Sequence, residues 1–168
     1  VVNLPVYDFE LTVVPLFDED RVLVAPAGHP LYGRDVVDLE ELVDHELLLE
    51  APGTPFRDSL EAVASLRGRK LRPKAEFDGM RLLASLAFAG YGAGIVPASA
   101  APSGVPGDWR KVSITGVPGR SVGLARRRRS MLSPAQRVVA EAISEVVAAQ
   151  AEGQSGIYPA PGTPRTLV

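Results

Sequence analysis

The stretch from Glu76 to Pro97 constrains the fold most, because a helix, a glycine-rich turn and a strand follow one another there directly. Apolar residues recur at helical spacing at Leu82, Leu83, Leu86 and Ala87. Gly90 stands where this helix should end, since glycine adopts the left-handed conformation without a Cβ clash. Gly92 and Gly94 then let the backbone approach a neighbouring group, before a short apolar strand that proline ends. A helix leading into such a turn beside a sheet is typical of the places where α/β proteins hold small ligands.

Strands and helices alternate along the rest of the chain, which predicts an α/β fold with parallel strand pairing. Strands are expected at 11–16, 21–26, 46–50, 74–77, 109–114 and 121–125. Capping signals predict helix starts at Asp38 with Glu41, at Thr54 with Pro55, and at Ser133 with Gln136. The last helix is expected to bury a stripe formed by Val139, Ile143, Val146 and Val147.

Length and composition limit the classes of protein that the chain can represent. Its 168 residues fit one domain or two small lobes, and a formal net charge of −2 gives no global positive field for nucleic acid. The absence of cysteine excludes disulfides, thiolate chemistry and Cys-ligated metals. No secretion signal is visible, so we expect a cytoplasmic protein. Residues 151–168 show little periodicity and are predicted to form a flexible tail.

The uncharged run over residues 82–107 is long enough to suggest a membrane span. Eight glycines and prolines interrupt it, and such punctuation indicates turns and a loop. We therefore predict a buried helix and strand here, and no membrane partner.

Sequence motifs for catalysis and for metal or cofactor binding are missing. His29 and His45, the two histidines, lack the spacing of a metal site, and structural or solvent-exposed roles are favoured. There is no Gly-x-Ser-x-Gly elbow and no Walker phosphate loop. The glycines at 90–94 superficially resemble a dinucleotide fingerprint, but they follow a helix and lead into a strand, the reverse of the required order. No catalytic residue, metal site or cofactor is predicted.

Two features could bind anions, and each has an ordinary structural explanation. The run Arg126–Arg129 could form a phosphate or nucleic-acid patch, but a solvated strand end before an acidic helix is favoured. Thr54 heads a helix whose free N–H groups and positive dipole end could hold a carboxylate. An ordinary helix cap with Phe56 in the core explains the same residues about equally well.

Several segments occur in an order and spacing that are fairly specific together. They are Pro15–Leu16, Asp20–Pro26, Gly28–Leu31, Val37–Leu42, Leu47–Leu49, Gly53–Thr54 with Arg57, Ala87–Pro97, and Leu124–Arg127 before Ser133–Pro134. In these segments the chain resembles the effector-binding domain of LysR-type transcriptional regulators, over about residues 1–149.

The resemblance implies a fold like that of type 2 periplasmic binding proteins, with one complete lobe and one incomplete lobe. Residues 18–118 would form the complete second lobe, and residues 1–17 with 119–150 would belong to the incomplete first lobe. The family binds DNA through a winged helix-turn-helix that has no counterpart in these residues. The resemblance also implies a homodimer or tetramer for the intact protein.

The family's effector contacts map onto two turns of the second lobe. They imply effector-binding residues at Gly53, Thr54, Pro55 and Phe56, and at Asp78, Gly79 and Met80. A small anionic metabolite would bind there, between the lobes, and control DNA binding by the intact protein without any bond being broken. Two alternatives remain open. One is a solute-binding protein of a transporter, and the other is an enzyme on a two-lobed fold in which Asp78 would act on the substrate.

Overall fold

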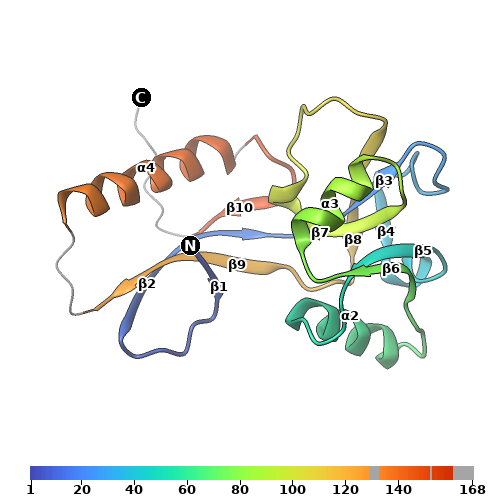
Figure 1. Ribbon diagram of the computed structural model, residues 1–168, viewed down its shortest axis with the longest axis horizontal. Helices are drawn as coiled ribbons and strands as arrows, with labels where there is room; N and C mark the ends of the chain where they lie inside the picture. Colours follow the sequence, from blue (N-terminus) through green and yellow to red (C-terminus); the bar gives the residue numbers. More distant parts are fainter. Residues whose placement is uncertain (129–132, 152, 161–168) are drawn as a thin grey trace. The chain divides into compact units, whose positions relative to one another are not determined.

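The chain folds as two compact units that share one polypeptide in an insertion topology. The computed structural model describes residues 1–128, 133–151 and 153–160 (Figure 1). Unit 1 comprises Val1–Glu19 with Gly119–Val168, and unit 2 comprises Asp20–Pro118. Unit 2 is therefore one continuous segment inserted into unit 1. The boundary predicted after residue 17 falls inside a strand of unit 1, because that strand continues to Glu19.

Unit 2 is built on a six-stranded sheet in the order β4-β8-β3-β7-β5-β6. The strands are β3 (Arg21–Pro26), β4 (Val36–Asp38), β5 (Glu46–Glu50), β6 (Arg72–Phe77), β7 (Ala93–Pro97) and β8 (Trp109–Thr115). β5 pairs parallel with β6 and β7, and β4 pairs parallel with β8, whereas β3 is antiparallel to both of its neighbours. The carboxyl ends of β5, β6 and β7 thus share one edge of the sheet with the amino end of β3. The predicted α/β fold with parallel pairing is confirmed.

The longer helices of unit 2 pack on opposite faces of this sheet. Its helices are α1 (Leu39–Leu42), α2 (Pro55–Leu66), α3 (Met80–Phe88) and the short 3-10 helix η1 (Ala98–Ala100). Leu60 of α2 belongs to the same buried cluster as Leu47 and Leu49 of β5. Successive side chains of a strand point to opposite faces. Leu48 accordingly lies on the other face, where Gly94 and α3 pack.

Gly94 brings α3 close to the sheet. A Cβ atom at this position would lie 2.9 Å from Cδ2 of Leu83 and 3.2 Å from Cβ of Ala87. Gly90 follows the end of α3 with a φ of +86°, as expected for a glycine that ends a helix. The close approach predicted from the glycine spacing is confirmed for Gly94, and the approaching group is the helix itself. Leu82, predicted on the apolar side of this helix, is exposed.

The uncharged stretch predicted not to cross a membrane forms α3, β7, η1 and a loop. Among the residues that the structure describes, no helix is both long enough and apolar enough to span a bilayer.

Unit 1 has a four-stranded antiparallel sheet in the order β1-β9-β2-β10. The strands are β1 (Val2–Leu4), β2 (Leu11–Glu19), β9 (Arg120–Arg127) and β10 (Ile157–Pro159), and α4 (Pro134–Ala151) lies against β2 and β10. The side chains of Val139 and Val146 on α4 are 57% and 58% exposed, and Ile143 and Val147 are half-buried. The buried stripe predicted for the last helix is therefore wrong, because the short sheet of unit 1 covers little of that face.

The C-terminal segment differs from the predicted flexible tail. α4 continues to Ala151, and residues 153–160 turn back and add β10 to the sheet. The predicted tail also includes residues 152 and 161–168, which lie outside the described residues.

The predicted caps are present, with one difference. The hydroxyl of Ser133 accepts from the backbone N–H of Gln136 at 3.2 Å, and the Gln136 side chain accepts from the Ser133 N–H at 2.9 Å. Asp38 caps α1 by accepting from the Glu41 N–H, but the Glu41 carboxylate pairs with Arg34 instead of returning to the cap.

Arg126, Arg127 and Arg128 are exposed around the end of β9, and Arg129 lies outside the described residues.

Candidate functional site

The two turns predicted to bind effector follow neighbouring parallel strands of unit 2. Glu50, the last residue of β5, is in register with Phe77, the last residue of β6. Just beyond these ends, the N–H of Ala51 donates a 2.9 Å hydrogen bond to the carbonyl of Phe77. The turns 53–56 and 78–80 therefore leave the sheet side by side at the same edge. Crevices beyond the carboxyl ends of parallel strands are where open α/β sheets commonly bind ligands.

The first turn is fixed by its own hydrogen bonds before α2 begins. Gly53 has a φ of +86°, and its N–H donates to the carboxylate of Asp58 at 3.0 Å. The hydroxyl of Thr54 accepts from the N–H of Arg57 at 3.3 Å and donates to the carbonyl of Ala51 at 3.1 Å. Pro55 is the first residue of the helix, as predicted. The ordinary cap is thus formed, while one lone pair of the hydroxyl oxygen remains for a further donor.

The second turn leads into the start of α3 with no side chain to cap it. Gly79 is the N-cap residue and makes no side-chain hydrogen bond to the helix. Asp78 and Gly79 are exposed, and Met80 is half-buried. The first N–H groups of a helix lack partners within the helix, and they attract anions because the dipole is positive there. α2 and α3 both begin at this edge, so two such helix ends lie along it.

Arg57 holds the three elements of this edge together, and sequence reasoning gave it no role. Its side chain is 4% exposed. The guanidinium donates to the Glu61 carboxylate at 2.8 Å, to the Glu50 carbonyl at 2.9 Å, and to the Glu76 carboxylate at 2.8 Å. It therefore ties the start of α2 to the ends of β5 and β6. Arg57 was part of the motif that carries the resemblance. Its position in the first turn of a predicted helix was the sequence signal that could have indicated a role at this edge.

Arg21 is a second buried cation at the same edge, and it was also missed. It is the first residue of β3, and its side chain is 6% exposed. Its guanidinium lies over the ring of Phe56, 3.8 Å from the ring centroid, and 3.9 Å from a carboxylate oxygen of Glu50. A cation over an aromatic ring is attracted to the negative face of that ring. Arg21 thus contacts one of the predicted effector-binding residues. Two sequence signals were available for Arg21: it is a charged residue at the start of an otherwise apolar strand, and it lies within a segment that carries the resemblance.

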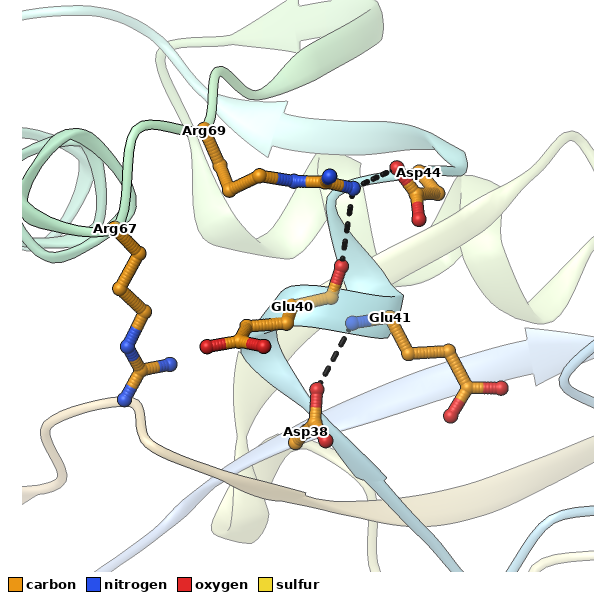
Figure 2. A pocket seen from close by; sticks show the side chains of 6 residues that line it. All are labelled: Asp38, Glu40, Glu41, Asp44, Arg67 and Arg69. Carbon is orange, nitrogen blue, oxygen red and sulfur yellow. Dashed lines mark hydrogen bonds and ion pairs between the residues drawn. The ribbon is translucent and has the colours of Figure 1, made fainter.

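A surface cavity of about 500 Å³ lies elsewhere on unit 2 and contains none of the predicted site residues (Figure 2). It is lined by Asp38, Glu40, Glu41, Asp44, Arg67 and Arg69. Figure 2 shows Arg69 bonded to the Asp44 carboxylate and to the Glu40 carbonyl. Asp44 and Arg69 precede the amino ends of β5 and β6, so this cavity lies toward the opposite edge of the sheet from the two turns.

The histidines lie close together, although the sequence did not indicate this. The rings of His29 and His45 are 5.3 Å apart, and Nδ1 of His29 accepts from the N–H of Leu31 at 3.2 Å. Burial lowers the pKa of His29 below its usual value, and the nearby His45 and Lys74 lower it further. No group of three or more potential metal-ligating side chains occurs within the described part of the chain.

Comparison with known proteins identifies the family. Residues 1–148 match the family described as the LysR substrate binding domain, and the chain belongs to this family. The chain is 34% identical over 160 residues to the "Probable hydrogen peroxide-inducible genes activator" of Mycobacterium leprae, a match that covers 89% of this chain and 49% of the relative. The chain thus spans about half the length of the curated relatives it matches.

Solved structures agree with this assignment. The reduced form of the OxyR regulatory domain from Pseudomonas aeruginosa matches with a TM-score of 0.64 and 29% identity, over 84% of this chain and 70% of that chain. The CcmR regulatory domain from Synechocystis, solved in complex with 2-PG, matches with a TM-score of 0.67 and 18% identity, over 89% of this chain and 71% of that chain. The predicted fold like that of type 2 periplasmic binding proteins is confirmed. The family consists of transcriptional regulators rather than enzymes.

Proposed function

We propose that this chain senses a small anionic metabolite for a LysR-type transcriptional regulator, and that unit 2 contacts the metabolite through residues 53–56 and 78–80. The observation that carries the proposal is the 2.9 Å hydrogen bond from Ala51 to Phe77, which sets both turns side by side at the carboxyl edge of the sheet. In the intact protein, effector binding would favour one conformation and thereby change DNA binding.

The electrostatics of this edge favour an anion. The amino ends of α2 and α3 supply N–H groups and positive dipole ends. Two buried arginines add positive charge to this edge. Arg21 lies against the ring of Phe56, and Arg57 lies in the first turn of α2. Three carboxylates are near these arginines, those of Glu50, Glu61 and Glu76, and they offset much of this charge. A small anion with one or two charged groups therefore suits the edge better than a polyanion.

Ligand binding is a better candidate than thiol oxidation for the sensing step. The similar mycobacterial proteins are named as probable hydrogen peroxide-inducible activators. These 168 residues contain no cysteine, so no thiol in them can react with peroxide. The family match also supports a regulator over the solute-binding protein that shares its fold. For the intact protein we propose a cytoplasmic homodimer or tetramer that contacts DNA through a winged helix-turn-helix.

Calorimetric titration of the intact protein tests the site. The first probes are 2-PG, which the CcmR regulatory domain binds, and a panel of small mono- and dicarboxylates. We expect Thr54→Ala to weaken binding of any anion that binds by about tenfold or more, because a hydrogen bond to a charged group contributes about 1.5–3 kcal/mol. Thr54→Ser keeps the hydroxyl and should retain most of the affinity.

Ser65→Ala is the matched control, since Ser65 is exposed near the other end of the same helix. The proposed site is wrong if Thr54→Ala and Ser65→Ala bind the anion equally well. The proposed function is wrong if no small anion binds and expression of the target genes responds to none.

A further inference from the structure

The outer edge of β2 is covered by a segment that lies outside the family match. The match ends at residue 148, and β10 follows it at Ile157–Pro159. β10 pairs antiparallel with the end of β2, with Ile157 opposite Glu19 and Pro159 opposite Phe17. A part of the chain that the family does not account for therefore adds a strand to the sheet of unit 1.

This strand is held at both ends. Beyond it, the N–H of Ala160 donates to the carbonyl of Leu16 at 3.0 Å, and both side chains are buried. Before it, the N–H of Ile157 donates to the carbonyl of Gln154 at 3.2 Å, and Gly156 has a φ of +79°. The positive φ lets the chain turn sharply after α4, because glycine has no Cβ to clash in that conformation. The turn delivers β10 directly to the edge of β2.

Pro159 is placed where it costs no hydrogen bond to β2. Opposite residues of an antiparallel pair alternate between bonded and non-bonded positions. Ala160 and Leu16 are bonded, so Tyr158 and Asp18 form the next bonded pair, and Pro159 lies between them in a non-bonded position. The proline nitrogen therefore faces outward, where it offers no donor to another strand.

β10 is itself a short edge strand of the described sheet. It is three residues long, and its last residue is Pro159. Short edge strands with proline are a known means of preventing pairing between chains. If β10 were removed, this end of β2 would become an open edge, and Leu16 and Asp18 would lose the backbone partners that Ala160 and Tyr158 supply.

We propose that the edge of β2 at Leu16–Glu19 is a strand-binding surface, and that residues 153–160 occupy it as a strap. The partner that fits the surface when it is open is the same segment of a second copy of this chain, because that segment has the required register and proline position. Closing the surface in cis keeps unit 1 from pairing edge to edge with another molecule.

Backbone amide exchange and light scattering test the strap. A chain ending at Glu152 should show about tenfold or faster exchange at the amide of Asp18, which pairs with Tyr158 in the full chain, because local opening sets the exchange rate there. It should also associate more strongly than the full chain. A chain ending at Ala160 keeps the strap and is the matched control, and it should behave as the full chain does. A synthetic peptide of residues 153–160 should restore protection, and the same peptide with Tyr158→Pro should not.

The full chain with Tyr158→Pro provides a second test, which does not depend on the shortened chain folding. This variant removes the N–H that faces Asp18 and should raise exchange at the amides of Asp18 and Ala160, while the amides of unit 2 keep their protection. The proposal is wrong if exchange at the amides of Asp18 and Ala160 is unchanged in this variant. It is also wrong if the peptide fails to protect a folded chain ending at Glu152.

Discussion

At the scale of single residues, the best-defined constraint is the contact between Gly94 and α3. β7 is fully buried, and Gly94 is the position at which the helix lies closest to it. Gly94→Ala should destabilise unit 2 by about 1–3 kcal/mol, the usual cost of adding a methyl group to a packed core. Chemical denaturation with tryptophan fluorescence would measure this, since Trp109 lies in the same unit.

Gly33→Ala is the matched control, because no atom lies within 4 Å of a Cβ placed there. A surface change of this kind should alter the free energy of unfolding by less than about 0.5 kcal/mol. Equal effects of the two substitutions would contradict the close approach at Gly94.

His29 is the residue through which pH should act on stability. Burial holds its folded pKa below the usual value of 6.5, with His45 and Lys74 acting in the same direction. The unfolded state therefore binds more protons than the folded state between the lowered pKa and about 6.5. The contribution of neutral His29 to the free energy of unfolding should be complete above pH 6.5. It should decrease as the pH falls from about 6.5 to the lowered pKa of His29.

The variant His29→Asn should flatten this pH dependence, because asparagine has no titrating group. Its side-chain oxygen can still accept from the Leu31 N–H, so the local hydrogen bond is kept. Urea midpoints between pH 5 and pH 8 would provide the measurement. An unchanged slope in His29→Asn would show that another group is responsible.

At the scale of single elements, local signals predicted where helices start, and long-range contacts decided what they bury. The caps at Thr54 and Ser133 were predicted because their signals are local. Pro55 follows Thr54 directly, and Gln136 lies three positions after Ser133. The stripe on α4 was mispredicted, because its periodicity shows an apolar face without showing what covers it. β10 was missed for a related reason, since three residues with a proline carry no strand pattern.

The same reasoning explains which parts of the proposed site the sequence could suggest. Gly53–Phe56 and Asp78–Met80 were named from the family resemblance, and the parallel pairing of β5 with β6 brings them together. Arg21 was missed because its contact with Phe56 joins positions far apart in the sequence. No periodicity within one element could indicate that pair.

The cap of α4 gives a prediction at this scale. Ser133→Ala removes the acceptor for the Gln136 N–H and should destabilise the start of the helix by about 1 kcal/mol. Faster amide exchange in the first turn of α4 would report the loss. Ser144→Ala is the control, because that hydroxyl only bonds back to the Ala140 carbonyl within the helix. Equal exchange in the two variants would argue against the cap.

At the scale of the whole molecule, the apolar residues are divided unequally between the units. Unit 2 contains the entire main cluster of buried side chains. Unit 1 exposes several large apolar side chains, namely Val1, Tyr7, Phe9, Val14, Val138, Val139, Val146 and Tyr158. We therefore expect unit 2 to be the more stable body.

The insertion topology has a practical consequence for engineering. Glu19, the last residue before unit 2, lies directly opposite Arg120, close to the point at which the chain returns. Both ends of the inserted segment are therefore held within one strand-to-strand spacing of each other. A segment whose two ends lie close together can be inserted into a surface loop of another protein without forcing the ends of that loop apart. Residues 20–118 thus form a continuous unit that can be moved between proteins as one piece.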